Sequence, residues 1–160
     1  AGRRQARQAG GSMIELSTKG RYATRLLVHL AGHPLGTVVR RQDMADAEAI
    51  SVDYVEQLLI KLKGAGLVRS HRGARGGYSL ATDPHSITVA DVLRVMEGPF
   101  ELVPCVRQDC SRQDRCRTRS IWREAAAALI TVFSAHTIGA IATGSTDGDL
   151  HTLDPNGDSA

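Results

Sequence analysis

Two short helical segments separated by three residues, and followed by a glycine-rich hairpin, constrain the fold of this chain most strongly. The sequence predicts helices over residues 41–48 and 52–63, with Ala-Ile-Ser at 49–51 between them. In the second helix, apolar residues recur at helical spacing, at Val52, Val55, Leu59 and Leu62. Two short strands are predicted over 67–71 and 78–81, and the RGARGG between them supplies the glycines that a wide hairpin tip needs. This order of elements predicts a mainly α fold with a small β wing, which is a winged helix-turn-helix.

Further helices on both sides of this unit complete the expected architecture. Ser17 or Thr18 can cap a helix that ends near Ala31, and Thr88 can cap a helix formed by ADVLRVME. The buried residues expected in helix 41–48 are Met44, Ala45 and Ala47. The whole chain has 160 residues, which suits one domain with appendages. We divide it into a disordered extension or expression remnant (1–12), a winged helix-turn-helix DNA-binding domain (13–97), a cysteine-bearing loop (98–118), a dimerisation helix with a short terminal helix (119–142) and a disordered tail (143–160).

The long helix expected from about Thr118 to Ser134 is apolar on two sides. Its two stripes are Ile121, Ala125, Ala128 and Val132, and Trp122, Ala126, Leu129 and Phe133. A small domain seldom covers two sides of one helix, so the pattern favours a homodimer, with burial inside the protomer as the alternative.

The uncharged stretch 125–144 has the length of a membrane span, and it needs a separate interpretation. Polar residues and a glycine interrupt it, at Thr131, Ser134, His136, Thr137 and Gly139. We therefore expect a buried helix followed by a second short helix, with no membrane partner. The Arg-containing start leads into Gly and Ser rather than an apolar signal segment, so we expect a cytoplasmic protein.

The first half of the chain is basic, which suits a nucleic-acid partner. Residues 13–82 hold ten Lys or Arg and six acidic side chains, in a chain of net charge +3. In helix 52–63 the apolar stripe must face the core, and Ser51 is the expected N-cap. The outer face at its N-terminal end then carries Asp53, Tyr54, Glu56 and Gln57. The alternative for this set is an ordinary polar surface.

These outer side chains have the chemistry that reading of bases requires. Gln57 can pair with adenine, Glu56 can accept from the cytosine amino group, and Tyr54 can bond a phosphate or stack. The acidic groups repel phosphate, so they weaken non-specific binding while they select sequence.

Basic side chains outside the helix pair are expected to contact the DNA backbone or the minor groove. Arg72 and Arg75 lie at the glycine-rich tip of the hairpin, which can approach either one. Lys19 and Arg21 lie in the first turn of the first helix and suit phosphate contact. Each of these alone is as well explained by solvation, and it is the combination with the helix pair that favours DNA.

The cysteines are odd in number and close together. Cys105, Cys110 and Cys116 are the only three in the chain, so a closed set of intramolecular disulfides is excluded. Thiolate ligands suit iron–sulfur clusters and zinc, and the neighbouring Arg residues would lower the pKa of these thiols. Zinc sites more often contain C-x2-C pairs, which this chain lacks. Spacing alone leaves a cluster, zinc, and free or redox-active thiols open.

Three segments resemble the IscR-like family of bacterial repressors. They are Ser17-Thr18-Lys19-Gly20-Arg21-Tyr22-Ala23, then Ile50-Ser51 with Tyr54-Val55-Glu56-Gln57-Leu58, and Gly66-Leu67-Val68 with Arg72-Gly73-Ala74-Arg75-Gly76-Gly77-Tyr78. The resemblance covers roughly residues 14–142 and includes the three cysteines, Trp122 and Thr137-Ile138-Gly139. It implies a dimeric winged-helix regulator that binds an iron–sulfur cluster. It also implies that Tyr54, Glu56 and Gln57 contact bases and backbone, and that Arg72 enters the minor groove.

The chain departs from this family at two positions of the predicted helix-turn-helix. Asp53 stands where relatives often carry a small hydroxyl residue, and Ala49 stands where a turn glycine is usual. A non-glycine residue in a left-handed conformation costs about 1–2 kcal/mol. These departures bear on the target sequence and leave the expected fold unchanged.

The resemblance implies that Cys105, Cys110 and Cys116 hold the cluster, and it leaves a fourth ligand to be found. Relatives with a 2Fe–2S cluster have a His three residues after the last cysteine, where this chain has Arg119. Other relatives use an acid near the start of the partner's first helix, where this chain has Arg21. Guanidinium stays protonated and cannot coordinate a metal. The remaining candidates are Asp109, Asp114, Glu101, His33, His136, or a solvent or small-molecule ligand. The absence of both usual fourth ligands favours a 4Fe–4S cluster with one exchangeable iron over a 2Fe–2S cluster, as the resemblance to three-cysteine relatives implies.

We expect a homodimeric DNA-binding regulator that acts as a repressor. Its binding to a palindromic operator would be controlled by an iron–sulfur cluster. Such a cluster would sense iron, cluster status, redox state or nitric oxide. The alternative is a cluster-free regulator that acts through thiol oxidation or by docking a metabolic enzyme. An enzyme is not expected, because Gly73, Gly76 and Gly77 lie in a hairpin rather than between a strand and a helix, and no nucleophile–base pair is evident.

Overall fold

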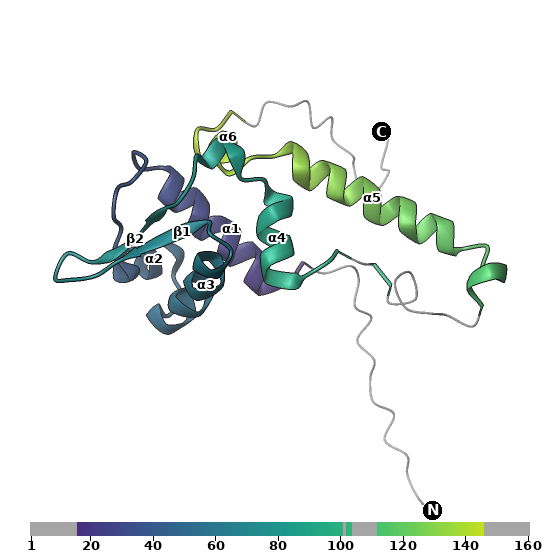
Figure 1. Ribbon diagram of the computed structural model, residues 1–160, viewed down its shortest axis with the longest axis horizontal. Helices are drawn as coiled ribbons and strands as arrows, with labels where there is room; N and C mark the ends of the chain where they lie inside the picture. The colour runs from purple at the N-terminus through teal and green to yellow at the C-terminus, as the bar shows by residue number, and fades with distance from the viewer. Residues whose placement is uncertain (1–15, 101, 104–111, 146–160) are drawn as a thin grey trace, which may run out of the picture.

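The computed structural model describes residues 16–100, 102–103 and 112–145 (Figure 1). Its elements in order are α1 (Thr18–Ala31), α2 (Arg41–Glu48), α3 (Val52–Gly64), β1 (Val68–His71), β2 (Gly77–Leu80), the 3-10 helix η1 (Pro84–Ser86), α4 (Val89–Glu97), the 3-10 helix η3 (Gln113–Arg115), α5 (Arg119–Ala135) and α6 (Ile138–Ala142). The helices α1 to α4, the hairpin and α6 form one lobe, and α5 extends away from it (Figure 1). The mainly α fold with a small β wing is confirmed.

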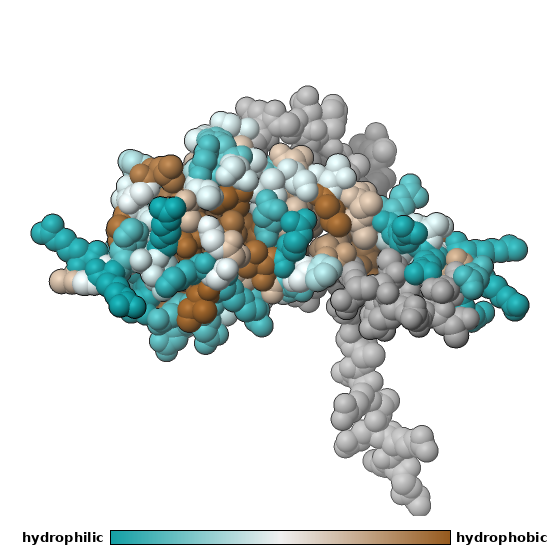
Figure 2. Space-filling view, in the orientation of Figure 1, coloured by the Kyte–Doolittle hydropathy of each residue, from teal (hydrophilic) through white to brown (hydrophobic). Residues whose placement is uncertain are grey.

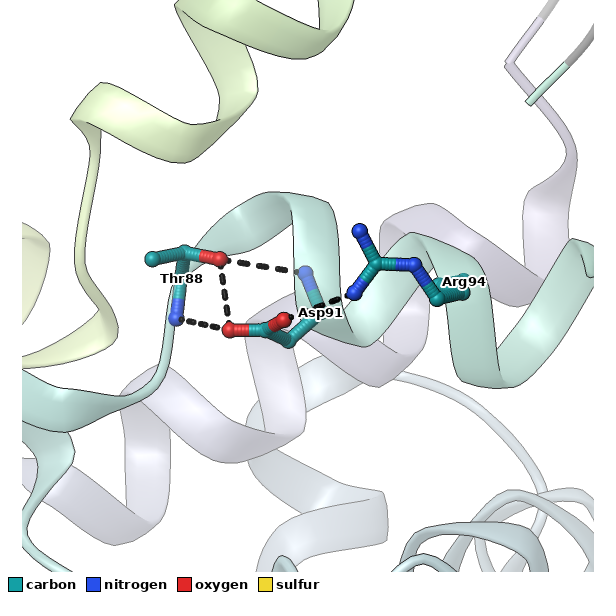
Figure 3. A network of polar contacts seen from close by, with 3 residues as sticks. All are labelled: Thr88, Asp91 and Arg94. Carbon is teal, nitrogen blue, oxygen red and sulfur yellow. Dashed lines mark hydrogen bonds and ion pairs between the residues drawn. The ribbon is translucent and has the colours of Figure 1, made fainter. Parts of the chain in front are cut away.

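Local capping signals fix where the helices begin. The Ser17 hydroxyl accepts from the Gly20 N–H at 3.2 Å, and α1 begins at the next residue. At the start of α4 the Thr88 hydroxyl accepts from the Asp91 N–H at 3.1 Å, while the Asp91 carboxylate accepts from the Thr88 N–H at 3.1 Å (Figure 3). This reciprocal pair satisfies N–H groups that a helix leaves without partners. The predicted N-caps are therefore confirmed.

The wing is a two-stranded antiparallel sheet whose register runs from Val68 opposite Leu80 to His71 opposite Gly77. The segment before α2 lies against it, since Val39 donates to the Tyr78 carbonyl at 2.9 Å and accepts from the Tyr78 N–H at 2.8 Å. A Cβ atom at Gly77 would lie 2.2 Å from the Val39 carbonyl oxygen, so only glycine permits this approach. The hairpin is therefore tied to the chain that leads into the helix pair.

The core lies between α1, α3 and α4, and α2 and α6 close it. Its largest fully buried side chains are Leu26, Leu27, Met44, Leu58, Leu59, Leu62, Ile87, Ile138, Val55, Val68 and Val92. One expectation was wrong. Ala47 is exposed, because α2 packs chiefly on α1 and α3 and turns Met44 and Ala45 inward. The predicted stripe of α3 does face the core, and Leu58 beside it is also buried because α3 is covered by neighbours on several sides.

Within this one chain, α5 has no buried residue. Three of its large apolar side chains stay exposed, Ile121 by 55%, Trp122 by 40% and Val132 by 47%. Its contact with the lobe runs along α4, where the Phe133 ring meets Phe100 edge to face at 5.9 Å. The described part of the chain therefore leaves the two apolar stripes of this helix incompletely covered.

The chain returns to the core immediately after α5. The Val89 N–H donates to the His136 carbonyl at 2.9 Å, and the Ile138 N–H donates to the Ile87 carbonyl at 2.8 Å. The Ile138 side chain is fully buried. Thr143 and Ser145 close the last turn with bonds to Gly139 and Ala140, so the first three residues assigned to a tail belong to this turn.

Several expectations fall outside the described residues. These are the extension 1–12, Cys105, Cys110, Glu101, Asp109 and the tail from 146 onward. Among the helices that are described, none combines the length and the apolar character that a bilayer crossing requires.

Candidate nucleic-acid interface and cysteine loop

The first two turns of α3 carry the side chains that were predicted to contact bases. The Ser51 hydroxyl accepts from the Tyr54 N–H at 3.2 Å, which defines the start of the helix. Asp53 and Gln57 are exposed, and Tyr54 and Glu56 are half-buried. The structure thus brings all five together at one end of one helix.

The Tyr54 side chain is held by α1. Its ring meets the Tyr22 ring edge to face, with the centroids 6.0 Å apart. The Arg25 guanidinium lies 5.3 Å from the Tyr22 centroid and forms an ion pair with Glu48, the last residue of α2. Tyr22 and Arg25 were not among the predicted site residues, because their role depends on how α1 packs against the helix pair.

The carboxylate of Glu56 forms an ion pair with Arg41, the first residue of α2. This contact partly neutralises the charge that was expected to select against phosphate. Arg40 and Arg41 were also missed, although an Arg-Arg pair at the start of a helix-turn-helix is a readable signal. Both are exposed and suit phosphate contact.

The wing supplies the second basic element. Arg72 and Arg75 are exposed at its tip, where Gly73 has a φ of 104°. A Cβ atom at Gly76 would lie 2.5 Å from the His71 carbonyl oxygen, so the tip can close only with glycine there. A recess of about 310 Å³ separates the wing from the helix pair, and it is lined by Arg41, Glu56, Ser70, His71, Gly73, Gly76, Gly77 and Tyr78.

Lys19 and Arg21 are exposed in the first turn of α1. Lys19 precedes Tyr22 by three residues, so it lies on the same face of α1, one turn before the contact with Tyr54. The same end of α1 is joined to the end of α4, because the Ser17 hydroxyl donates to the Glu97 carboxylate. A Cβ atom at Gly20 would lie 2.8 Å from Leu93, so the two helices meet closely there.

The turn between α2 and α3 contains the one non-glycine residue with positive φ among those described. Ala49 has φ 54° and ψ 44°, which is the left-handed conformation expected for this position. Its N–H donates to the Asp46 carbonyl at 3.4 Å, and the Ile50 N–H donates to the Ala45 carbonyl at 3.1 Å.

Cys116 is the described member of the three cysteines. It is half-buried, and its Sγ lies 3.5 Å from the Thr118 hydroxyl oxygen. Hydrogen bonds from the Thr118 side chain and backbone lower the pKa of the Cys116 thiol, and the charge of Arg112 adds to this. Metal ligation requires the thiolate, so this environment fits a ligand cysteine.

The described candidates for a fourth ligand are dispersed. Asp114 is exposed in η3, two residues before Cys116. His33 follows α1, where its ring meets His29 at 5.5 Å, and His136 lies at the other end of α5 from Cys116. Within the described residues, no three His, Cys, Asp or Glu side chains are grouped as a metal site.

Hydrophilic side chains gather at both ends of the long axis of the molecule, over the tip of the hairpin and over the start of α5 (Figure 2). A helix-turn-helix with an arginine-tipped wing defines a winged-helix DNA-binding protein. Residues 16–144 match the Rrf2 family, which is described as iron-dependent transcriptional regulators. The chain belongs to this family.

Relatives within the family are similar over most of their length. The HTH-type transcriptional regulator IscR of Vibrio parahaemolyticus is 34% identical over 131 residues, which are 81% of this chain and 78% of that protein. The structure of CymR, the global cysteine regulator of B. subtilis, superimposes with a TM-score of 0.70 at 35% identity, over 82% of this chain and 98% of CymR. The structure of T. potens IscR gives 0.64 at 31% identity, over 86% and 92%. These relatives confirm an IscR-like transcriptional regulator that binds DNA.

Proposed function

We propose that this chain is a homodimeric repressor whose binding to a palindromic operator is controlled by an iron–sulfur cluster on Cys105, Cys110 and Cys116. The observation that carries the proposal is the position of Cys116 in the chain. A thiol with a lowered pKa lies three residues before α5, the helix whose apolar residues stay uncovered. Cluster ligation would therefore act directly on the helix that is expected to join two protomers.

A second copy of the chain is the partner that suits α5. Ile121 and Val132 lie on one predicted stripe and Trp122 on the other, and all three are exposed. Two-fold pairing of α5 would bring two helix-turn-helix units into one particle, and a two-fold protein matches a palindromic site. The mass of the chain is 17.2 kDa, so the dimer would have about twice that mass.

The donor set fits a cluster that lacks one protein ligand. Thiolates are the ligands of iron–sulfur clusters, and the arginines near Cys116 offset their negative charge. When bound, the cluster would supply an iron that reacts with oxidants, nitric oxide or an exchangeable ligand. We favour 4Fe–4S over 2Fe–2S, because Arg119 and Arg21 occupy the positions of the usual fourth ligands.

A cluster-free mechanism is the second candidate, and two observations favour it. The lowered pKa of Cys116 also suits thiol oxidation, and the TM-score to CymR, 0.70, is higher than the 0.64 to T. potens IscR. In this case the regulator would respond through its thiols, or by docking a metabolic enzyme.

Anaerobic purification with iron and sulfide tests the proposal. We expect visible absorption, a native mass of a dimer plus cluster, and an operator affinity that differs between the cluster-bound and apo forms. Coupling of about 1–3 kcal/mol would change affinity by roughly 5- to 150-fold. Cys116→Ser should abolish both the absorption and the difference in affinity, whereas Ser120→Ala, at an exposed position and with all three cysteines retained, serves as the control and should change neither.

The outcome separates the two candidates. A colourless protein whose operator affinity changes only on thiol oxidation would replace the cluster mechanism with the thiol mechanism. Equal operator binding by the cluster-bound, apo and oxidised forms would refute both.

A further inference from the structure

Tyr22 is a residue through which α1 contacts the N-terminal end of α3, where Tyr54 lies. Its ring lies at 84° to that of Tyr54, with 6.0 Å between the centroids. In this arrangement the positive edge of one ring faces the negative face of the other, so the contact favours one relative orientation. An aliphatic side chain at the same place would fill the space without selecting an orientation. Tyr54 is half-buried, so part of its side chain stays accessible while the ring is in contact with Tyr22.

Arg25 supports Tyr22 from the next turn of α1. The two residues are three apart and lie on one face of the helix. The Arg25 guanidinium lies 5.3 Å from the Tyr22 ring centroid, and its Nε pairs with the Glu48 carboxylate. One cation therefore contacts a ring on its own helix and an acid on α2.

Glu48 is in an unfavourable place for an acid unless it has this partner. It is the last residue of α2, where the helix dipole favours cations, and its side chain is only 10% exposed. The buried carboxylate needs a compensating charge, and Arg25 supplies it. The contact with α1 explains why an acid is accommodated there, directly before the left-handed turn at Ala49.

The helix-turn-helix is therefore held by α1 on both sides of its turn, at Glu48 before it and at Tyr54 after it. We propose that Tyr22, supported by Arg25 and Glu48, is a positioning residue that fixes the Tyr54 ring for operator recognition. The inference rests on the proposed function, since it requires that Tyr54 contact DNA. A side chain that is oriented before binding loses less rotamer freedom on the DNA, which raises affinity for the correct site.

The test compares Tyr22→Leu with Tyr22→Phe, alone and combined with Tyr54→Leu, in the full-length protein. The probes are a duplex that the wild-type protein selects from a random-sequence pool and a scrambled duplex of the same composition. Affinities are measured by fluorescence anisotropy at one fixed salt concentration. We expect Tyr22→Leu to lose about 2- to 10-fold on the selected duplex, the range that an aromatic pair supports. Tyr22→Phe keeps the ring and should retain wild-type affinity.

Two further results are expected if the effect acts through Tyr54. Tyr22→Leu should leave binding to the scrambled duplex unchanged, and it should cause no additional loss in the Tyr54→Leu background. A merely structural role of Tyr22 would instead weaken both duplexes alike and would add to the effect of Tyr54→Leu. Either of these findings would overturn the inference.

Glu48→Gln provides a second route if Tyr22→Leu does not fold. It removes the charge that holds Arg25 and leaves every ring in place, so a smaller loss of about 2-fold is expected, again confined to the selected duplex. A Glu48→Gln protein with unchanged affinity would contradict the support that we assign to Arg25. If Tyr54→Leu itself binds like wild type, the positioning inference fails while DNA recognition stands, and if the wild-type protein selects no duplex, the proposed function fails.

Discussion

Replacing Ile138 with Ala tests whether the segment after α5 is part of the DNA-binding lobe. Ile138 follows a helix without buried residues, yet its own side chain is fully buried in the core. Its N–H bonds to the Ile87 carbonyl at 2.8 Å, a contact that Ala would keep. The substitution therefore removes packing and leaves the backbone connection unchanged.

The expected cost follows from complete burial. Large-to-small changes at fully buried Ile or Leu positions cost about 2–5 kcal/mol, and the value depends on how far the surroundings can collapse. Ile138 lies where α6 closes a core formed by other elements, so we expect partial collapse and a loss of about 3 kcal/mol. For a folded unit of this size, that loss corresponds to a decrease in Tm of roughly 10 °C.

Urea denaturation followed by far-UV circular dichroism measures this loss at a fixed protein concentration, because association would change the apparent stability. Ile60→Ala is the matched control, since it makes the same chemical change on the outer face of α3, where Ile60 is 59% exposed. The control should stay within about 0.5 kcal/mol of wild type. Equal and small effects of the two substitutions would show that α6 is not anchored in the core, and the return of the chain described above would be refuted.

Two other substitutions address the backbone and the helix caps. Ala49→Gly should raise the free energy of unfolding by about 0.5 kcal/mol, because relief of the left-handed conformation of Ala49 outweighs the added chain entropy of glycine. Thermal melting measures the change, and a destabilised Ala49→Gly protein would contradict the strain assigned to Ala49. At α4, the hydrogen bond from the Thr88 side chain holds the pKa of the Asp91 carboxyl below its usual value of 3.8. The charged Asp91 therefore stabilises the fold above pH 3.8, and this stabilisation is lost as the pH falls through the lowered pKa. Asp91→Asn should therefore destabilise the protein by about 0.5 kcal/mol at neutral pH, and the difference from wild type in urea denaturation should shrink below pH 3.8; a pH-independent difference would argue against the charged cap.

Features that depend on local signals could be predicted from the sequence. The hydroxyl caps Ser17, Ser51 and Thr88 each begin a helix where the sequence places it, because a cap needs only residues within one turn. The glycines of the hairpin predicted the wing for the same reason. The exposure of Asp53 and Gln57 at the N-terminal end of α3 followed from the apolar stripe on its opposite side.

Features that depend on packing between distant segments could not be predicted. The pairing of Arg41 with Glu56 joins two helices, and the contact of Tyr22 with Tyr54 joins residues 32 apart. Leu58 is buried because several elements cover α3, and no pattern within α3 shows how many neighbours it has. The lowered pKa of Cys116 was anticipated from nearby Arg residues, but its largest cause is Thr118, whose hydroxyl must face the sulfur.

The chain leaves the lobe at the end of α4, after Gly98, and returns at His136, which bonds to the first residue of the same helix. The distance between the departure and return points is therefore set by one helix of nine residues, whatever lies between them. Because both ends of the cysteine-bearing segment are fixed at α4, we expect its length and its ligand set to vary with little effect on the packing of the helix-turn-helix and its wing.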